Sequence, residues 1–287
     1  MASTRVKIVL LVACIVVVFL IVGIFALGFL SKSAGGGKIG VIEVEGTITD
    51  MRDAMEDVVK FKEDDSIRGI VLRINSPGGA VGPTQEIFQE IKKLKAARKK
   101  VYVSMGSVCA SGGYYIASLG DRIYASPSTI TGSIGVIMQQ TVVEDLMKKI
   151  GVQENTIKSG LLKDTGSPFR KMTDEERAYL QNIIDSIYEQ FVKDVAEGRK
   201  MPIEKVKQLA DGRIYTGLQA KEAKLIDAIG TYYDAVDDMQ KALGLRGKPA
   251  LVHGKRPFSL LKWLISSTMQ DLIFKNFAQP VSFLYKP

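Results

Sequence analysis

Short apolar runs alternate with segments of helical periodicity along the first half of the sequence, and this alternation limits the fold more than any other feature. The runs are typical of buried strands, because they are rich in Val and Ile and end at Gly, Pro or Ser residues. The predicted strands are Ile39–Ile48, Ile67–Ile74, Val101–Met105 and Arg122–Ala125. Predicted helices lie between them, at Met51–Lys62, around Ile87–Leu94 and from Ser111 to Ser118. Strands that alternate with helices in this way predict an α/β domain with a largely parallel sheet.

The second half of the sequence carries clear helix signals and weaker strand signals. Two capping boxes, Thr173–Glu176 and Thr216–Gln219, each predict the start of a helix. The remaining predictions are a short helix at Val142–Ile150, a strand at Glu154–Lys158, a last helix at Tyr232–Leu243, and a loop at Leu251–Gly254.

The N-terminal region contains an uncharged apolar run from Ile8 to Leu30. It is about as long as the ~20 residues that cross a bilayer, and it is longer than the apolar part of a cleaved signal peptide. Arg5, Lys7 and the terminal amine lie before it and Lys32 and Lys38 after it, a small bias that favours a cytoplasmic N-terminus. The predicted organisation is a stub and anchor at 1–30, a linker at 31–38, a main domain at 39–245 and a tail at 246–287 with an amphipathic helix at Phe258–Phe277.

Charge and cysteine usage restrict the partners of the chain. The net charge is +8, but no basic cluster is interleaved with aromatic residues, so an anionic membrane surface is favoured over nucleic acid. The two cysteines, Cys14 and Cys109, lie in the predicted anchor and in the main domain, which makes a disulfide between them implausible, and their spacing is not that of a metal site. We therefore expect no metal, and Cys109 to be a small core residue.

Ser111 is the first candidate for chemistry because it lies where a predicted strand runs into a predicted helix. A serine there can present its hydroxyl beside the N–H of Gly112, at the positive end of the helix. Gly78 follows the strand Ile67–Ile74 in a Pro-Gly-Gly turn, and its N–H could supply a second donor for an oxyanion. The simpler alternatives are that Ser111 is an ordinary helix N-cap and that the Gly78 turn is only a turn.

A serine nucleophile also needs a base. His253 is the single histidine, and it lies in a predicted loop near the C-terminus, so a Ser-His-Asp triad is not favoured. A lysine can act instead if burial disfavours its charged form. Lys158 and Lys163 are the best placed, in a segment of small and apolar residues after a predicted strand. The alternative for both is a solvated loop lysine.

Four motifs in order resemble the signal peptide peptidase A family, the membrane-anchored Ser/Lys proteases of bacteria. The resemblance extends from about Ile39 to Leu243. Its motifs are Asn75–Gly79 (NSPGG), Cys109–Ile116 (CASGGYYI), Thr131–Val136 (TGSIGV) and Lys158–Asp164 (KSGLLKD).

The resemblance implies a serine endopeptidase that degrades remnant signal peptides in the membrane. Ser111 would be the nucleophile and Lys163 the general base, with Gly78 and Gly112 as oxyanion donors and Ser133 holding the Lys163 amine. No metal or organic cofactor would be needed.

The resemblance also implies a ClpP/crotonase-like fold, a spiral of strand-strand-helix units. Subunits would form a homo-oligomeric ring or dome in which the serine and the lysine meet across a subunit boundary. With the anchor, this implies a single-pass protein of the cell membrane whose catalytic domain is extracytoplasmic. A crotonase-type acyl-CoA enzyme and a non-catalytic membrane scaffold of the same fold remain the alternatives.

Overall fold

The structure is a computed structural model, and it describes residues 17, 19, 21, 37–254 and 282–284. The predicted anchor, apart from three single residues, and the predicted tail helix lie outside this range. Among the residues that the structure describes, no helix is long and apolar enough to cross a membrane.

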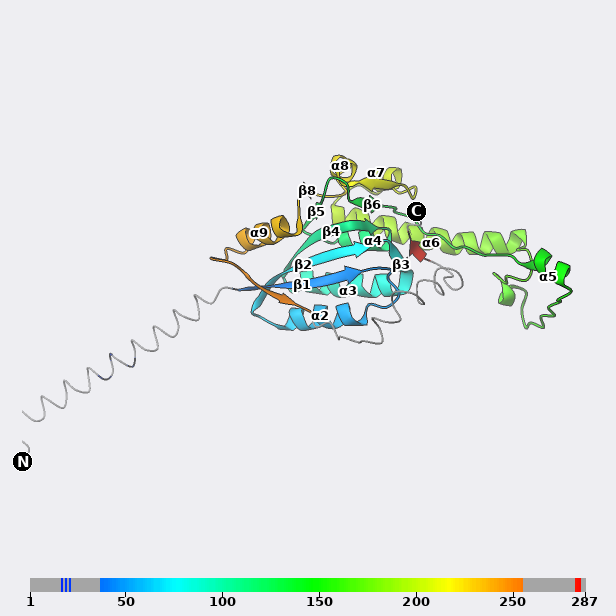
Figure 1. The fold of residues 1–287 in the computed structure, drawn as a ribbon, viewed down its shortest axis with the longest axis horizontal. Coiled ribbons are helices and arrows are strands. Elements are labelled where there is room, and N and C mark those ends of the chain that lie inside the picture. The colour runs from blue at the N-terminus through cyan, green and yellow to red at the C-terminus, as the bar shows by residue number, and fades with distance from the viewer. Residues whose placement is uncertain (1–16, 18, 20, 22–36, 255–281, 285–287) are drawn as a thin grey trace, which may run out of the picture.

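The main sheet is mixed and almost wholly parallel (Figure 1). Its order is β7-β6-β4-β2-β1-β9, with β5 beside β4 and β8 beside β5; only the β6–β7 pair is antiparallel. Its strands are β1 (Lys38–Glu45), β2 (Ile67–Ser76), β4 (Lys100–Ala110), β5 (Arg122–Ala125), β6 (Ile130–Gly132), β7 (Ile214–Thr216), β8 (Ala228–Ile229) and β9 (Ala250–His253). The predicted α/β class with a largely parallel sheet is confirmed.

A second, two-stranded sheet joins distant parts of the chain. β3 (Gly78–Ala80) pairs antiparallel with β10 (Ser282–Leu284), and Leu284 lies opposite Gly78. On its other side, β3 forms an isolated parallel bridge between Gly79 and Ile48. The Gly78 turn is therefore held between two segments of the chain.

Helices cover both faces of the main sheet. α2 (Arg52–Glu63) and α3 (Val81–Ala96) pack on one face, whereas α9 (Tyr232–Ala242) packs on the other. The remaining helices are α4 (Gly112–Ala117), α5 (Glu144–Ile150), α6 (Asp174–Arg199), α7 (Ile203–Leu209) and α8 (Gly217–Glu222), with a 3₁₀ turn, η1 (Leu161–Asp164).

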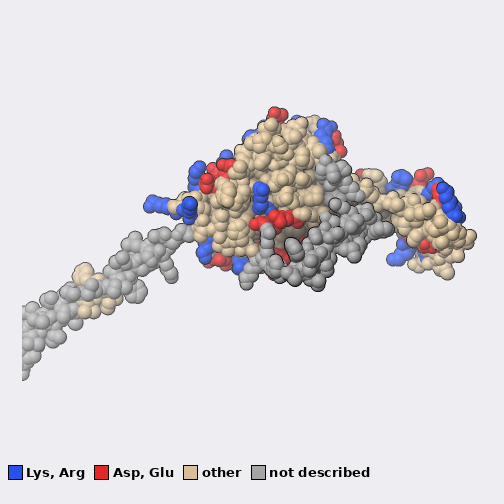
Figure 2. Space-filling view, in the orientation of Figure 1, with Lys and Arg blue, Asp and Glu red and all other residues tan. Residues whose placement is uncertain are grey.

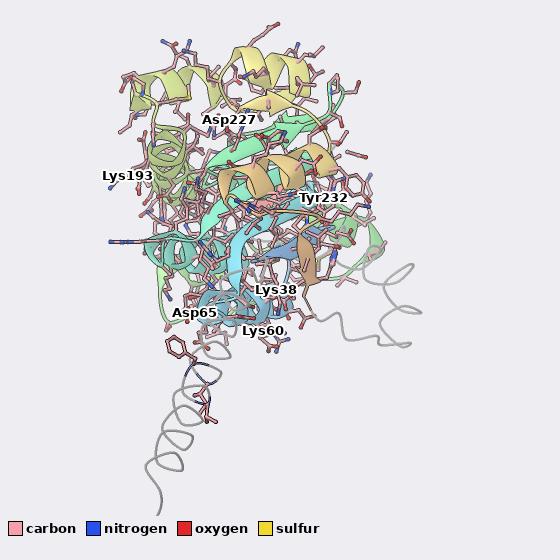
Figure 3. All side chains as sticks on the ribbon, turned by 90° about the vertical axis from the view of Figure 1, so that its left-hand side faces the viewer. Lys38, Lys60, Asp65, Lys193, Asp227 and Tyr232 are labelled. Atoms are coloured by element: carbon pink, nitrogen blue, oxygen red, sulfur yellow. The ribbon has the colours of Figure 1, made fainter. Side chains whose placement is uncertain are left out.

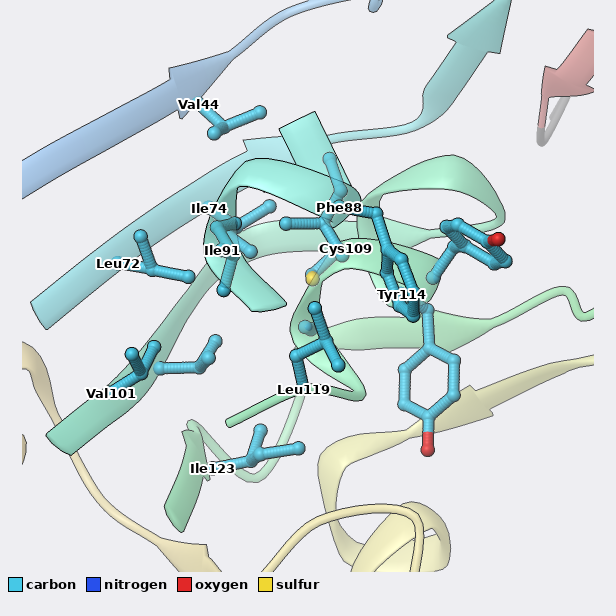
Figure 4. Close-up of a cluster of buried hydrophobic side chains, with 14 of the residues drawn as sticks. Val44, Leu72, Ile74, Phe88, Ile91, Val101, Cys109, Tyr114, Leu119 and Ile123 are labelled. Carbon is cyan, nitrogen blue, oxygen red and sulfur yellow. The ribbon is translucent and has the colours of Figure 1, made fainter. Parts of the chain in front are cut away.

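The largest core lies between the sheet and the α2–α3 layer. Leu72 and Ile74 of β2 point into it and meet Phe88 and Ile91 of α3 (Figure 4). All four side chains are completely buried, because alternate residues of a parallel strand face one side and each side is covered by helices. This apolar burial fixes the strand order that carries the candidate site.

The attachments of α6 and α9 are polar as well as apolar. Arg199, in the last turn of α6, donates to the Asp227 carboxylate at 2.7 Å, and Asp227 also accepts from the backbone N–H of Ile123 in β5. A third capping box at Thr231 opens α9. Figure 3 shows Asp227 close to β5 and Tyr232 at the start of α9.

Residues 139–172 and the first half of α6 form an arm that extends away from the sheet (Figure 1). The prediction of a strand at Glu154–Lys158 is wrong, since this part of the arm is exposed coil. No strand in the described part of the chain pairs with it, and Ile157 is fully exposed. The strand-like composition of this segment is therefore not sufficient to form a strand without a partner.

The prediction of a loop at Leu251–Gly254 is also wrong. Ala250–His253 forms β9, which pairs in parallel with β1 at the edge of the sheet. Leu251 packs partly on the apolar cluster under α9. An edge strand of four residues has little periodicity of its own, and it is formed here by contacts with β1, which is distant in sequence.

Candidate active site

Ser111 occupies a tight turn between β4 and α4. Its backbone has φ 52° and ψ −118°, a conformation that is costly for a residue with a side chain. The turn is held by two hydrogen bonds of 2.8 Å: the Ser111 N–H donates to the Gly132 carbonyl, and the Tyr115 N–H donates to the Ser111 carbonyl. The Ser111 side chain does not cap α4, so the interpretation as an ordinary N-cap is wrong.

The register of the sheet brings two further turns to Ser111. Ala110 of β4 lies opposite Gly132 of β6, so Ser111 and Ser133 are the next residues on neighbouring strands. On the other side of β4, Cys109 lies opposite Ser76 of β2. Ser111 and Gly78 each come two residues later, so they occupy equivalent positions at the ends of these two strands. Because parallel strands end at a common edge, the three turns gather there.

Ser133 resembles Ser111 in conformation and burial. Its φ is 50°, and its N–H donates to the carbonyl of Arg213 at 2.8 Å. The exposed fractions of Ser111 and Ser133 are only 1% and 8%. Neither hydroxyl forms a hydrogen bond with any residue that the structure describes. Both residues are buried but neither hydroxyl oxygen is fully enclosed, so both hydroxyls at this edge of the sheet are available to a third group.

Gly78 and Gly112 present backbone N–H groups on either side of this position. Gly112 is the first residue of α4, so its N–H has no acceptor inside the helix. Gly78 has φ 101°, and its N–H donates to the Ser76 hydroxyl at 3.1 Å. The Gly78 carbonyl accepts from the Ile48 N–H at 2.9 Å.

Ser76 is a contributor that the sequence interpretation missed. It is completely buried, and it also limits how closely α4 approaches, since a Cβ at Gly113 would lie 2.9 Å from the Ser76 carbonyl oxygen. Its position directly before a Pro-Gly-Gly turn is the local signal that could have identified it.

Lys163 is not with these residues in the structure. It is exposed in η1, on the arm, which lies at the end of α6 away from the sheet (Figure 1). There it lines a shallow hollow of about 590 Å³ together with Leu162 and Glu175. Within the described chain it forms no hydrogen bond with Ser111 or Ser133. The structure therefore brings together Gly78, Ser111, Gly112 and Ser133, but not Lys163.

The other candidate bases are occupied or distant. Lys158 donates to the Asp164 carboxylate at 2.6 Å and to the Leu161 carbonyl at 2.9 Å. His253 lies on β9, where its Nδ1 is 3.6 Å from Glu43 Oε1. Cys109 is buried in the core, as predicted, and burial raises the pKa of its thiol far above the ordinary value (Figure 4).

Comparisons with known proteins identify the family to which the chain belongs. Residues 93–246 match peptidase family S49, a range that includes Ser111, Ser133 and Lys163. The chain is 40% identical over 225 residues to an Enterococcus faecium protein named "Putative signal peptide peptidase SppA", covering 74% of this chain and 65% of that protein. It is 45% identical over 205 residues to the Synechocystis sp. protein named "Putative protease slr0021", covering 71% and 74%.

A third relative is the "Protease 4" of Haemophilus influenzae, which is 35% identical over 223 residues. This match covers 75% of the present chain but only 36% of the longer relative. The predicted resemblance to the signal peptide peptidase A family, and with it the serine protease class, is confirmed. The family match and these relatives together place the chain in peptidase family S49.

Proposed function

We propose that this protein is a membrane-anchored serine endopeptidase that degrades remnant signal peptides with a dyad of Ser111 and Lys163. The observation that carries the proposal is the strained turn of Ser111, a buried residue that lies next to Ser133 in the sheet register and whose side chain does not cap its helix. Strained backbone of this kind persists where the surrounding structure holds it, and it gathers at active sites. Family membership favours this chemistry over an acyl-CoA enzyme or a scaffold.

In this proposal, Ser111 attacks the carbonyl carbon of a peptide bond and transfers its proton to neutral Lys163. The tetrahedral oxyanion accepts hydrogen bonds from the N–H groups of Gly78 and Gly112. The Gly78 N–H exchanges the Ser76 hydroxyl for the oxyanion at this step. Lys163 then protonates the leaving amine, and water hydrolyses the acyl-enzyme to release the second product. The Ser133 hydroxyl accepts from the Lys163 amine and keeps it in line.

The position of Lys163 on the arm supports a dyad that forms between subunits. The arm carries exposed apolar side chains at Leu146, Ile150, Ile157 and Leu161, and a second copy of the chain could bury them. A subunit boundary would also exclude water from the Lys163 amine, which favours its neutral form. We propose a homo-oligomeric ring or dome in which each arm delivers Lys163 to a neighbouring Ser111.

The β3–β10 pair supports an extended peptide as the substrate. Leu284 of β10 lies opposite Gly78, antiparallel to β3, so this edge of β3 accepts a strand right beside a proposed oxyanion donor, and a substrate would pair there in place of β10. Main-chain pairing of this kind binds peptides with little dependence on sequence. An enzyme that degrades varied signal peptides needs such tolerance.

Two finer parts of the proposal concern the fold and the membrane. The first half of β4 pairs with β5 and its last residues pair with β6, and this division supports a ClpP/crotonase-like spiral. The run Ile8–Leu30 supports a single membrane anchor, with the catalytic domain on the extracytoplasmic side. The chain would then act on peptides that remain in the bilayer.

Complementation tests the dyad and its assembly together. Ser111→Ala and Lys163→Ala proteins should each be inactive on an apolar peptide, whereas Lys149→Ala, which alters another exposed lysine of the arm, should be active. Mixed under conditions of subunit exchange, the two inactive proteins should regain activity, because some boundaries then join an intact Ser111 to an intact Lys163.

Two outcomes contradict different parts of the proposal. Substantial cleavage by Ser111→Ala or Lys163→Ala alone would reject the dyad. No recovery after proven exchange of subunits would reject assembly of the site between chains and leave the dyad in place.

A further inference from the structure

The arm contains a compact ion-pair network next to Lys163. The Asp164 carboxylate, 14% exposed, accepts from Lys158 at 2.6 Å and from Arg170 Nε at 2.9 Å. The other side of the Arg170 guanidinium donates to both oxygens of Glu176, to Oε2 at 2.8 Å. Figure 2 shows that charged side chains of both signs cover the end of the arm.

Glu176 connects this network to the start of α6. Its side chain is only 4% exposed, and Oε2 accepts from the Thr173 N–H at 2.9 Å. The Thr173 hydroxyl in turn accepts from the Glu176 N–H at 3.2 Å, which completes the capping box of α6. The contact with Arg170 lowers the pKa of Glu176 to about 2, so this carboxylate is charged throughout the neutral range.

Besides the link through Arg170, the turn that carries Lys163 has one direct hydrogen bond to Glu176 of α6, in which the Thr165 hydroxyl donates to Oε1 at 3.3 Å. The hydrogen bonds within residues 160–167 are local: the Lys163 N–H donates to the Gly160 carbonyl at 3.2 Å, and the Thr165 N–H donates to the Leu162 carbonyl at 3.2 Å. Leu161 and Leu162 are exposed. A short 3₁₀ turn with such bonds does not fix the direction of a lysine by itself. The link through Arg170 joins it to a helix of 26 residues.

We propose that Arg170 is a positioning residue, which holds the turn of Lys163 against the start of α6 by binding Asp164 and Glu176 at once. A planar guanidinium can bind two carboxylates in fixed directions, whereas an ammonium cannot fix them in the same way. This inference rests on the proposed role of Lys163 as the base, and it adds the residue that directs that base.

Arg170 also balances charge. The charged groups around the Lys163 turn are Lys158, Asp164, Arg170, Glu175 and Glu176. Without Arg170, the Asp164 carboxylate next to Lys163 keeps only one of its two cations, and the excess negative charge favours the Lys163 ammonium. Activity then requires a higher pH. Replacement of Asp164 by Asn has the opposite effect on charge and shifts the activity profile to lower pH.

The experiment compares Arg170→Gln, Arg170→Lys and Asp164→Asn in the full-length protein, with Arg52→Gln as the matched control. Arg52 forms an exposed ion pair with Asp50, so its loss reports the effect of removing an Arg–Asp pair away from the arm. Steady-state kinetics on an apolar peptide are measured across pH, and light scattering reports assembly.

We expect Arg170→Gln to lower kcat by about 100-fold, with little change in KM, since misplacement of a catalytic group by about 1 Å has an effect of this size. Its profile should move to higher pH and that of Asp164→Asn to lower pH, and Arg170→Lys should recover part of kcat. Arg52→Gln should match the unaltered protein.

If Lys163→Ala is inactive but Arg170→Gln has an unchanged kcat and an unchanged pH profile, the inference is overturned. If Lys163→Ala is itself active, the proposed function fails instead. Should Arg170→Gln not assemble, Arg170→Lys, which keeps the charge but not the planar fork, should lower kcat with little shift of the pH profile, and Asp164→Asn should shift the profile to lower pH. An unchanged kcat in Arg170→Lys together with an unshifted profile in Asp164→Asn would then overturn the inference.

Discussion

Replacement of Gly79 by alanine should disrupt the support of the proposed oxyanion turn. An added Cβ at Gly79 would lie 2.1 Å from the carbonyl oxygen of Ile48 and 2.6 Å from its backbone nitrogen. These are main-chain atoms of a segment that is hydrogen-bonded on both sides, so no flexible side chain can move to make room. The bridge between Gly79 and Ile48 must therefore open.

The size of the effect follows from what the bridge contains. Ile48 donates to the Gly78 carbonyl at 2.9 Å and accepts from the Ala80 N–H at 2.7 Å, and the substitution strains or breaks both bonds. Each is worth about 1 kcal/mol, and overpacking adds about 1–3 kcal/mol, so the free energy of unfolding should fall by about 2–5 kcal/mol. For a domain of this size, the Tm falls by roughly 4–20 °C.

The same substitution should reduce activity even where the protein remains folded. Displacement of β3 moves the Gly78 N–H, and loss of one oxyanion donor lowers kcat by about 10²–10³-fold. Thermal unfolding and peptide cleavage below the transition measure the two effects separately.

Gly82→Ala is the matched control for this prediction. Gly82 lies in the first turn of α3, and nothing is within 4 Å of a Cβ placed there. Alanine at this site should keep activity and raise the free energy of unfolding by at most about 1 kcal/mol. Equal stability and equal kcat for the two variants would refute the reasoning.

Two further predictions concern the buried groups around the Ser111 turn. Tyr115→Phe removes the hydroxyl that donates to the Asp194 carboxylate and joins α4 to α6. The free energy of unfolding measured in urea should fall by about 1–3 kcal/mol. The control Tyr233→Phe, at an exposed site, should leave it unchanged. Burial raises the pKa of the Cys109 thiol above its ordinary value of 9.0, so the unfolded chain loses this proton at a lower pH than the folded chain. The stabilising contribution is therefore complete below pH 9 and decreases as the pH rises above it. The stability lost between pH 8 and pH 10 should be smaller in Cys109→Ala, and an identical loss in both proteins would contradict the assignment.

The elements that the sequence predicted correctly are those with strong local signals. The strand at Ile67–Ile74 is rich in Ile, Val and Leu and ends at turn residues, and the long helix after Thr173 opens with a capping box. The strand predicted at Glu154–Lys158 had local propensity but no partner, and β9 had a partner but hardly any local signal. A strand depends on its neighbours, which lie elsewhere in the sequence.

The candidate site shows the same division between local and distant information. Gly78 and Ser111 each follow a predicted strand, whereas no strand is predicted directly before Ser133, and parallel pairing explains why the three residues meet at one edge. The direction of the Gly78 N–H, which binds the Ser76 hydroxyl, depends on a buried side chain and could not be deduced from spacing. Lys163 could be selected from its local surroundings, but its distance from Ser111 depends on how the arm is folded.

The bond between the Ser133 N–H and the carbonyl of Arg213 has a consequence for biosynthesis. β6, which leads into Ser133, is paired with β7 at Ile214–Thr216, so this turn is completed by residues that leave the ribosome long after Ser111 and Ser133. Contacts between segments so far apart in sequence form late in folding. A nascent chain that ends before Arg213 therefore carries both serines without the structure that orients them, and the protein acquires its nucleophile only when most of its synthesis is over.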